Sequence, residues 1–281
     1  MRWPPWTSNT NEKEGKEDKR EDKPPSSKKE DKAILHATDW AAFTESRTLI
    51  PTAILTSAIL LTVYVRTRVL RRFRDAPSIP SEGLRRRSVF GQVTSVGDGD
   101  NFRLYHTPGG RLAGWGSSWK KVPTAKKELK DETIHIRLAG VDAPELAHFG
   151  RPAQPYAREA HVWLTSYLLD RRVRAYLHRH DQYGRVVASV YVRRGFELPL
   201  PFVRRDVSYE MLRRGLATVY EAKQGAEFGG PAKEIKYRNA ERWARLWRKG
   251  LWKDYHRKGW ESPRDYKNRM GMSEQETKNG V

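Results

Sequence analysis

The chain has 281 residues, which suggests one or two domains, and it contains no cysteine. The lack of cysteine excludes disulfides, cysteine-ligated zinc and thiol catalysis. The formal net charge is +20, and the first 47 residues carry ten basic and ten acidic side chains. The whole positive excess therefore lies beyond residue 47. A basic surface of this kind attracts phosphate backbones or anionic lipid head groups, although a plain solvated basic face is about equally common.

Residues 1–47 are predicted to form a disordered, charged tail. The run from 11 to 32 mixes Lys, Glu, Asp, Pro and Ser with almost no apolar residue. Such a run cannot bury enough surface to offset the entropy of ordering. It also lacks the apolar core of a secretory signal, and its acidic residues are untypical of a cleavable mitochondrial presequence.

Residues 48–65 are predicted to form a transmembrane helix. These eighteen residues carry no charge and are rich in Leu, Ile and Val. At about 1.5 Å of rise per residue they span roughly 27 Å, close to a hydrocarbon core of about 30 Å. Pro51 is expected in the first turn, where its missing N–H costs little. A buried core helix is the alternative interpretation.

An arginine cluster after this segment favours the membrane interpretation. Its members are Arg66, Arg68, Arg71, Arg72 and Arg74. Such a cluster does not suit a packed core, but it suits a membrane interface on the side that retains positive charge. We therefore predict a single-pass anchor, with the larger domain that follows it facing the cytosol or an equivalent compartment such as the matrix.

The remaining chain predicts an α+β domain. Residues 66–87 are expected to form a basic juxtamembrane linker, 88–257 the folded domain, and 258–281 a polar tail. Strand patterns cover 88–96, 102–105, 133–141, 173–177 and 186–192, and helix patterns cover 155–169, 202–214 and 232–249. Gly215 and Gly250 follow the last two helices, where glycine commonly ends a helix. Five short strands with about three helices fit a five-stranded OB-type β-barrel.

Acidic residues gather at two places in this basic domain. Asp98 and Asp100 alternate with glycine directly after a strand, a pattern that usually indicates a plain turn. Asp142 and Glu145 follow the end of another strand, which also carries Arg137. Residues five apart on a regular strand face opposite sides, so a twist or bulge near Gly140 is needed to bring Arg137 and Asp142 to one rim. A structural salt bridge is the alternative.

Together with the turn at Tyr183-Gly184-Arg185, these groups resemble the staphylococcal-nuclease (thermonuclease-like) family from about residue 88 to 252. Residues 137–145 resemble the family's Arg-x-x-x-x-Asp-x-Pro-Glu signature. The Asp98–Asp100 turn and the Arg185 turn are similar to its two other active-site segments, in the same order. The preceding membrane segment makes the chain most similar to the fungal single-pass endonucleases of this family that are associated with mitochondria.

The resemblance implies a calcium site. Asp100 and Asp142 would be ligands, with Asp98 nearby and the backbone carbonyl of Ala143 as a further ligand. Calcium takes six to eight oxygens, so water and a substrate phosphate would complete the shell. Asn101 departs from the family's usual Thr, and its amide oxygen could still serve.

The resemblance also implies the catalytic groups. Glu145 would act as general base or orient the attacking water. Arg137 and Arg185 would hold the phosphate and stabilise the transition state, since a guanidinium stays charged and offers a planar fork. Tyr183 would stack on the nucleotide or bond to it. The family's tyrosine pair after the second helix is poorly preserved around Tyr220, which leaves nucleotide preference open.

These implications favour a membrane-anchored, calcium-dependent endonuclease that hydrolyses DNA, RNA or both, with its mitochondrial location implied by resemblance alone. One alternative is a catalytically silent OB-type module that tethers nucleic acid to a membrane, although inactive relatives of this fold typically lose the acidic residues. A membrane scaffold that binds anionic lipid is a more distant alternative. His178 and His180 alternate on a strand and could bind a metal, but they are interpreted as surface residues. The pair Trp243 and Trp247 is interpreted as core packing. The long stretch 104–132 is either a substrate-contacting loop or a plain insertion.

Overall fold

The computed structural model describes residues 46–147, 150–193, 204–221, 227–257 and 259–271. The tail predicted over residues 1–47 therefore lies almost entirely outside the described residues. The chain divides into two compact units, residues 1–59 and residues 60–281. The barrel and its helices belong to the second unit.

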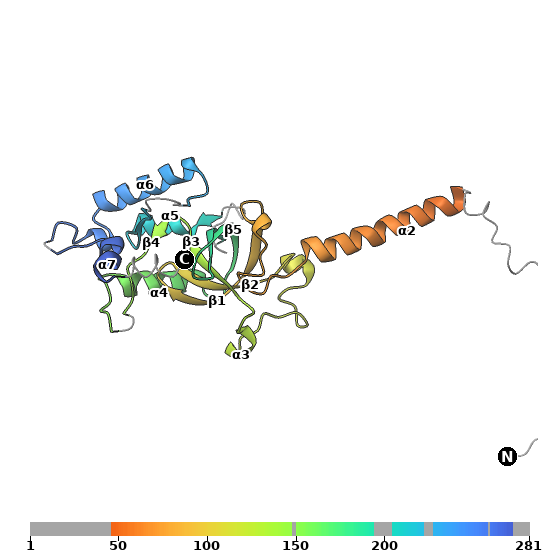
Figure 1. Ribbon diagram of the computed structural model, residues 1–281, viewed down its shortest axis with the longest axis horizontal. Helices are drawn as coiled ribbons and strands as arrows, with labels where there is room; N and C mark the ends of the chain where they lie inside the picture. The colour runs from red at the N-terminus through yellow and green to blue at the C-terminus, as the bar shows by residue number, and fades with distance from the viewer. Residues whose placement is uncertain (1–45, 148–149, 194–203, 222–226, 258, 272–281) are drawn as a thin grey trace, which may run out of the picture. The chain divides into compact units, whose positions relative to one another are not determined.

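Helix α2 (Ser46–Tyr64) corresponds to the predicted membrane segment (Figure 1). Within the described residues it is the one helix long and apolar enough to cross a membrane. None of its side chains is buried, which disfavours the alternative of a core helix. Pro51 lies inside the helix rather than in its first turn, and the Thr52 hydroxyl donates to the Thr48 carbonyl at 2.7 Å beside it. A π-helical turn, Val65–Val69, follows.

Five strands form a closed barrel, as the sequence predicts. They are β1 (Ser88–Asp98), β2 (Asn101–His106), β3 (Ile134–Leu138), β5 (Arg172–His180) and β6 (Val186–Val192). Antiparallel pairing gives the order β3-β2-β1-β5-β6, and a parallel pairing of β3 with β6 closes the barrel. Arg137 stands opposite Val187 in this closing pair.

Strand alternation explains the barrel core. Val89 and Val93 of β1 point inward between more exposed neighbours, and Phe102 and Leu104 of β2 do the same. β6 is buried along nearly its whole length because helices cover its outer face. A register shift between Val93 and Ser95 bends β1, which helps a short sheet to close.

Two short pairings extend the barrel toward the helices. β4 (Val141–Asp142) pairs antiparallel with β8 (Thr218–Val219), so that Asp142 stands opposite Thr218. β7 (Arg205–Asp206) pairs with the end of β6. The predicted strand over 133–141 is thus divided into β3 and β4 by the turn at Gly140.

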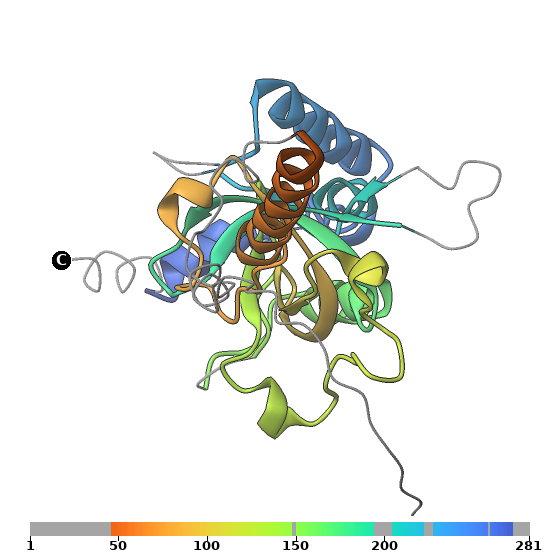
Figure 2. The ribbon, with the colours of Figure 1, turned by 90° about the vertical axis from the view of Figure 1, so that its right-hand side faces the viewer.

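Helices α4 (Ala157–Leu168), α5 (Val207–Arg214) and α6 (Pro231–Leu246) confirm the three predicted helices. In Figures 1 and 2, α6 lies on the outer side of α5. α5 begins five residues later than predicted, because β7 occupies 205–206 and the Asp206 side chain caps the helix at the Tyr209 amide, 3.3 Å away. It ends at Gly215, as expected, with φ of +67°.

The interpretation of Trp243 and Trp247 as core packing is wrong for Trp247, which is 63% exposed. α6 ends at Leu246, three residues before the predicted boundary, so Trp247 lies beyond the helical face that packs on the barrel. The Trp243 ring is only partly buried and lies between the cations of Arg213 and Lys249, at 4.9 and 4.1 Å.

The segments expected as linker and insertion are partly packed. Phe73, Ala76 and Ile79 of the 66–87 segment join the barrel core. Arg72 forms an ion pair with Glu132 at 2.7 Å, so it belongs to the domain surface rather than to a free basic cluster. The 104–132 stretch contains a short helix, α3 (Lys126–Leu129), and its Trp115 is buried while Trp119 is 80% exposed.

The predicted polar tail also contains structure. Helix α7 (Pro263–Arg269) begins with a capping box formed by Ser262 and Asp265. Pro263 and Tyr266 are buried, which anchors the helix against the domain. Two apolar residues in a charged segment give little periodic signal, so the sequence pattern did not indicate this helix.

Candidate active site

The turn between β1 and β2 carries the first acidic pair. Asp98 ends β1 and pairs with Asn101, so Gly99 and Asp100 form a two-residue connection. A Cβ on Gly99 would lie only 2.7 Å from the Cβ of Ala143. Glycine therefore lets this turn lie directly against the loop that follows β4, and Asp100 is buried there. The acidic Asp-Gly-Asp turn is part of the site rather than a plain surface turn.

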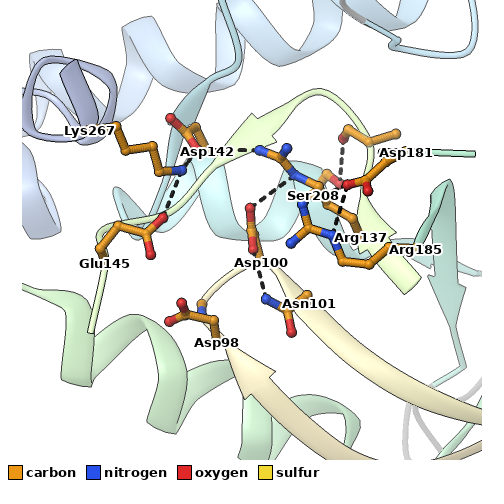
Figure 3. Close-up of polar contacts among 12 residues, drawn as sticks. Asp98, Asp100, Asn101, Arg137, Asp142, Glu145, Asp181, Arg185, Ser208 and Lys267 are labelled. Carbon is orange, nitrogen blue, oxygen red and sulfur yellow. Dashed lines mark hydrogen bonds and ion pairs between the residues drawn. The ribbon is translucent and has the colours of Figure 1, made fainter. Parts of the chain in front are cut away.

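The turn at Gly140 brings Arg137 and Asp142 to one rim, as the sequence analysis required. Gly140 has a φ of +72°, a backbone conformation that residues other than glycine rarely adopt. Arg137 then lies with its Nε 3.2 Å from Oδ2 of Asp100 and its Nη2 3.5 Å from Oδ1 of Asp142 (Figure 3). One guanidinium thus joins the two acidic segments.

Charge outweighs burial at this junction. Burial alone would raise the pKa of Asp100, but Arg137, Lys267 and Arg185 bring the pKa of that carboxyl below its ordinary value. Burial likewise opposes the charge on Arg137, and Asp100 and Asp142 outweigh it so that the pKa of the guanidinium is raised. Both groups are therefore ionised at neutral pH.

Glu145 lies on a loop that Gln154 holds at two points. The backbone amide of Glu145 donates to the side-chain carbonyl of Gln154 at 3.0 Å. The backbone amide of Gln154 donates to the backbone carbonyl of Glu145 at 2.9 Å. Burial raises the pKa of the Glu145 carboxyl to about 7 against the opposing charge of Lys267, and Asp100 and Asp98 add to the increase. Asp98 lies on the Glu145 side of the site in Figure 3.

Arg185 reaches the same rim from a separate hairpin. The β3–β6 pairing sets Val187 beside Arg137, and Arg185 precedes it by two residues. The guanidinium of Arg185 is held by its own turn: its Nη2 lies 2.6 Å from Oδ2 of Asp181, and the Tyr183 ring lies 5.0 Å away. Figure 3 shows both guanidiniums beside Asp100.

Two residues join the site that the sequence analysis did not place there. The Tyr220 ring lies 5.0 Å beneath the guanidinium of Arg137, so the poorly preserved tyrosine region still supplies one aromatic contact. Lys267 of α7 places its ammonium 2.6 Å from Oδ1 of Asp142 and 2.7 Å from Oε1 of Glu145. Lys267 lies 125 residues from Asp142 in the chain and belongs to no recognisable motif. Its place in the site could therefore not be predicted from the sequence.

The donor set suits a hard cation. Within the described residues, no group of three Asp, Glu or His side chains is arranged to hold a metal. The carboxylates of Asp142 and Glu145 nevertheless converge on one cation, the ammonium of Lys267 (Figure 3). Carboxylate oxygens around a shared cationic point are the ligands that calcium and magnesium take.

The other residues singled out in the sequence make the following contacts. Ala143 is buried, and its Cβ lies close to Gly99. Asn101 donates from its amide to Asp100 at 3.3 Å and contacts the His135 ring with its oxygen at 3.1 Å. His178 and His180 bond to Ser189 and to the Ile79 carbonyl, so they do not form a metal pair with each other.

The chain is similar to known proteins over nearly its whole length. The family model described as staphylococcal nuclease homologue matches residues 135–254. The chain is 67% identical to the probable endonuclease lcl3 of Penicillium rubens over 279 residues, which cover 98% of this chain and 93% of that protein. It is 66% identical to the probable endonuclease lcl3 of Emericella nidulans over 280 residues, or 98% of this chain and 99% of the relative. The similarity thus extends well beyond the barrel.

Proposed function

Because the chain belongs to the staphylococcal nuclease family, we propose that it is a calcium-dependent endonuclease, anchored in a membrane, that hydrolyses phosphodiester bonds of DNA, RNA or both. The observation that carries the proposal is the meeting of three separate chain segments at one rim. They bring together Asp100, Arg137, Asp142, Glu145 and Arg185 (Figure 3). The relatives named as probable endonucleases support the same reaction class.

In this proposal the carboxylates of Asp100 and Asp142 hold the cation, with the Ala143 carbonyl as a further oxygen. A bound divalent cation would polarise a phosphodiester oxygen and neutralise charge that develops there. Asp100 forms an ion pair with Arg137 in the structure. In this proposal it would offer an oxygen to the cation while it stays beside that guanidinium. Asp98, on the Glu145 side, adds negative charge near the ligands without being one of them.

The two arginines hold the phosphate. Each guanidinium can donate two parallel hydrogen bonds to phosphate oxygens and stays charged throughout. Arg137 is oriented by Asp100, Asp142 and the Tyr220 ring, while Arg185 is oriented by Asp181. Tyr183 is 46% exposed beside Arg185, where its ring could contact a nucleotide base.

Glu145 is the proposed base. Its carboxylate lies beside Asp142 through their common contact with Lys267, and Gln154 fixes the loop that carries it. From this position it can accept the proton of the attacking water or orient that water toward phosphorus.

Cleavage of circular DNA and of RNA by the detergent-solubilised full chain tests the proposal. We expect cleavage with calcium, none with chelator, and a loss of about 10²- to 10⁴-fold for Glu145→Gln, the range of general acid–base catalysis. Glu128→Gln, at an exposed position of α3, is the matched control and should leave the rate unchanged. No cleavage with any divalent ion, or full activity in Glu145→Gln, would contradict the proposal.

We further propose that α2 anchors the protein in a mitochondrial membrane with the nuclease domain on the side that keeps positive charge. The exposed Arg66 and Arg68 follow α2 and support this orientation. Imaging of a tagged chain, combined with protease protection of isolated mitochondria, tests both parts. Localisation to another membrane, or domain digestion only after the opposite compartment is opened, would contradict them.

A further inference from the structure

Lys267 occupies the point where a cation is expected. Its ammonium contacts two carboxylates, that of Asp142 at the end of β4, at 2.6 Å, and that of Glu145 on the following loop, at 2.7 Å (Figure 3). The lysine side chain is 18% exposed, so the contact lies inside the site rather than on its rim. The residues that it bridges are the proposed metal ligand and the proposed base.

The charges explain why a lysine is held there. Asp100 and Asp142 contact the guanidinium of Arg137, whereas Glu145 contacts the ammonium of Lys267. Without Lys267, the Glu145 carboxylate would add an excess of negative charge beside Asp142, which is costly in a partly buried setting. The ammonium of Lys267 reduces that excess, as a metal ion would.

A divalent cation and this ammonium cannot share the same oxygens. Calcium lies at about 2.3–2.6 Å from its ligand oxygens. An ion bound to Oδ1 of Asp142 would therefore occupy the space that the Lys267 ammonium fills. Two positive charges at such a separation also repel strongly in a partly buried site. Binding of the metal therefore requires the ammonium to leave.

The helix that carries Lys267 is seated on the same loop as Glu145. The Gln154 amide group donates to the Ser262 carbonyl at 3.4 Å, just before α7, while its side-chain oxygen accepts from the Glu145 amide. The Tyr266 hydroxyl donates to the Pro152 carbonyl. Movement of α7 is thus connected to the loop that positions the base.

This seat is small and incompletely filled. α7 has seven residues, of which Pro263 and Tyr266 are buried. A cavity of about 250 Å³ lies next to it, lined in part by Pro144, Tyr156, Trp260 and Pro263. A short helix with two buried anchors beside a cavity can separate from the domain without opening the barrel core.

We propose that Lys267 is a built-in competitor of the metal ion: α7 docks its ammonium between Asp142 and Glu145, and the divalent cation binds when that ammonium is displaced. This inference rests on the proposed calcium site. Docking of α7 and binding of the metal then oppose each other, and by linkage each weakens the other by the same factor. A factor of about 5- to 150-fold is typical of coupled sites.

Calorimetric titration of the detergent-solubilised full chain with calcium tests the competition. Lys267→Met should bind calcium at least about tenfold more tightly than the natural chain, because the competing charge is gone. Lys253→Met removes an exposed lysine near the same segment and should not change the affinity. Tyr266→Phe keeps the lysine but loses the hydroxyl contact with Pro152, so it should tighten calcium binding by a smaller factor.

Hydrogen exchange supplies a second readout that does not depend on cleavage or on a substitution. Saturation of the natural chain with calcium should increase exchange of the backbone amides of residues 264–269 relative to those of α4. Unchanged or weaker calcium binding by Lys267→Met, or an α7 that stays protected at saturating calcium, would overturn the competition. If neither the natural chain nor Lys267→Met binds calcium, the calcium site itself is overturned; equal binding by both overturns only the role of Lys267.

Discussion

The two arginines at the rim are held in different ways. Arg137 contacts Asp100, Asp142 and the Tyr220 ring, which come from three different parts of the chain. Arg185 contacts Asp181 and Tyr183, both within its own hairpin turn. The region around Arg137 therefore joins several parts of the fold as well as belonging to the candidate site. The Arg185 hairpin is a local unit that the barrel brings to the same place. Substitutions in the two regions should separate stability from activity.

The largest effect is expected for Arg137→Met. It should abolish measurable cleavage and lower the free energy of unfolding by about 3–5 kcal/mol, because it leaves Asp100 buried without its main partner. Urea denaturation followed by tryptophan fluorescence measures the stability, and cleavage assays measure the rate. A fully stable Arg137→Met chain would show that the contacts of Arg137 contribute little to the free energy of unfolding.

Arg185→Lys should lower the cleavage rate by about 10²-fold while stability changes by less than about 1 kcal/mol. The lysine keeps the positive charge but lacks the planar guanidinium. The loss of the guanidinium affects only the contacts within one hairpin. Denaturation and cleavage are measured as for Arg137→Met. A loss of stability as large as that of Arg137→Met would contradict the distinction between the two regions.

The glycines of the two turns provide a matched pair. Gly140→Ala would place a Cβ 2.6 Å from the Phe228 ring and 2.9 Å from Tyr237, in addition to the strain of a positive φ. We expect a stability loss of about 3 kcal/mol and roughly tenfold slower cleavage, since Asp142 shifts away from Arg137.

In Gly184→Ala the added Cβ would have no atom within 4 Å. The φ of this residue is +68°. The variant should lose only about 1 kcal/mol, the cost of the left-handed conformation alone. Thermal melting of the two variants compares them directly. Equal losses would mean that the tight packing around Gly140 is relieved at little cost.

Asp181→Asn should have the smallest effect. It weakens the ion pair that holds Arg185 and leaves the guanidinium more available to a phosphate, so KM should fall by up to about fivefold with kcat little changed. Steady-state kinetics on a short labelled oligonucleotide separates the two constants. A rise in KM would instead show that Asp181 is needed to hold Arg185 in position.

The barrel and the acidic loop were accessible from the sequence because their signals are local. Alternating apolar residues indicated the five strands, and Arg137, Asp142 and Glu145 stand within nine consecutive positions. The requirement for a twist near Gly140 followed from strand geometry alone. Lys267 was not accessible, because its role depends on a helix with only two buried anchors. The exposure of Trp247 was missed because regular spacing does not reveal where a helix ends.

The parallel contact between β3 and β6 also has a consequence for the time at which activity can appear. Strands separated by some fifty residues must meet before Arg185 comes beside Arg137. Contacts between distant parts of a chain form slowly, since closing the intervening loop costs entropy before any contact repays it. A nascent or partly folded chain would therefore lack Arg185 beside Arg137, and its Asp142 would lack the pairing with Thr218. The protein would remain unable to cut nucleic acid until folding is nearly finished.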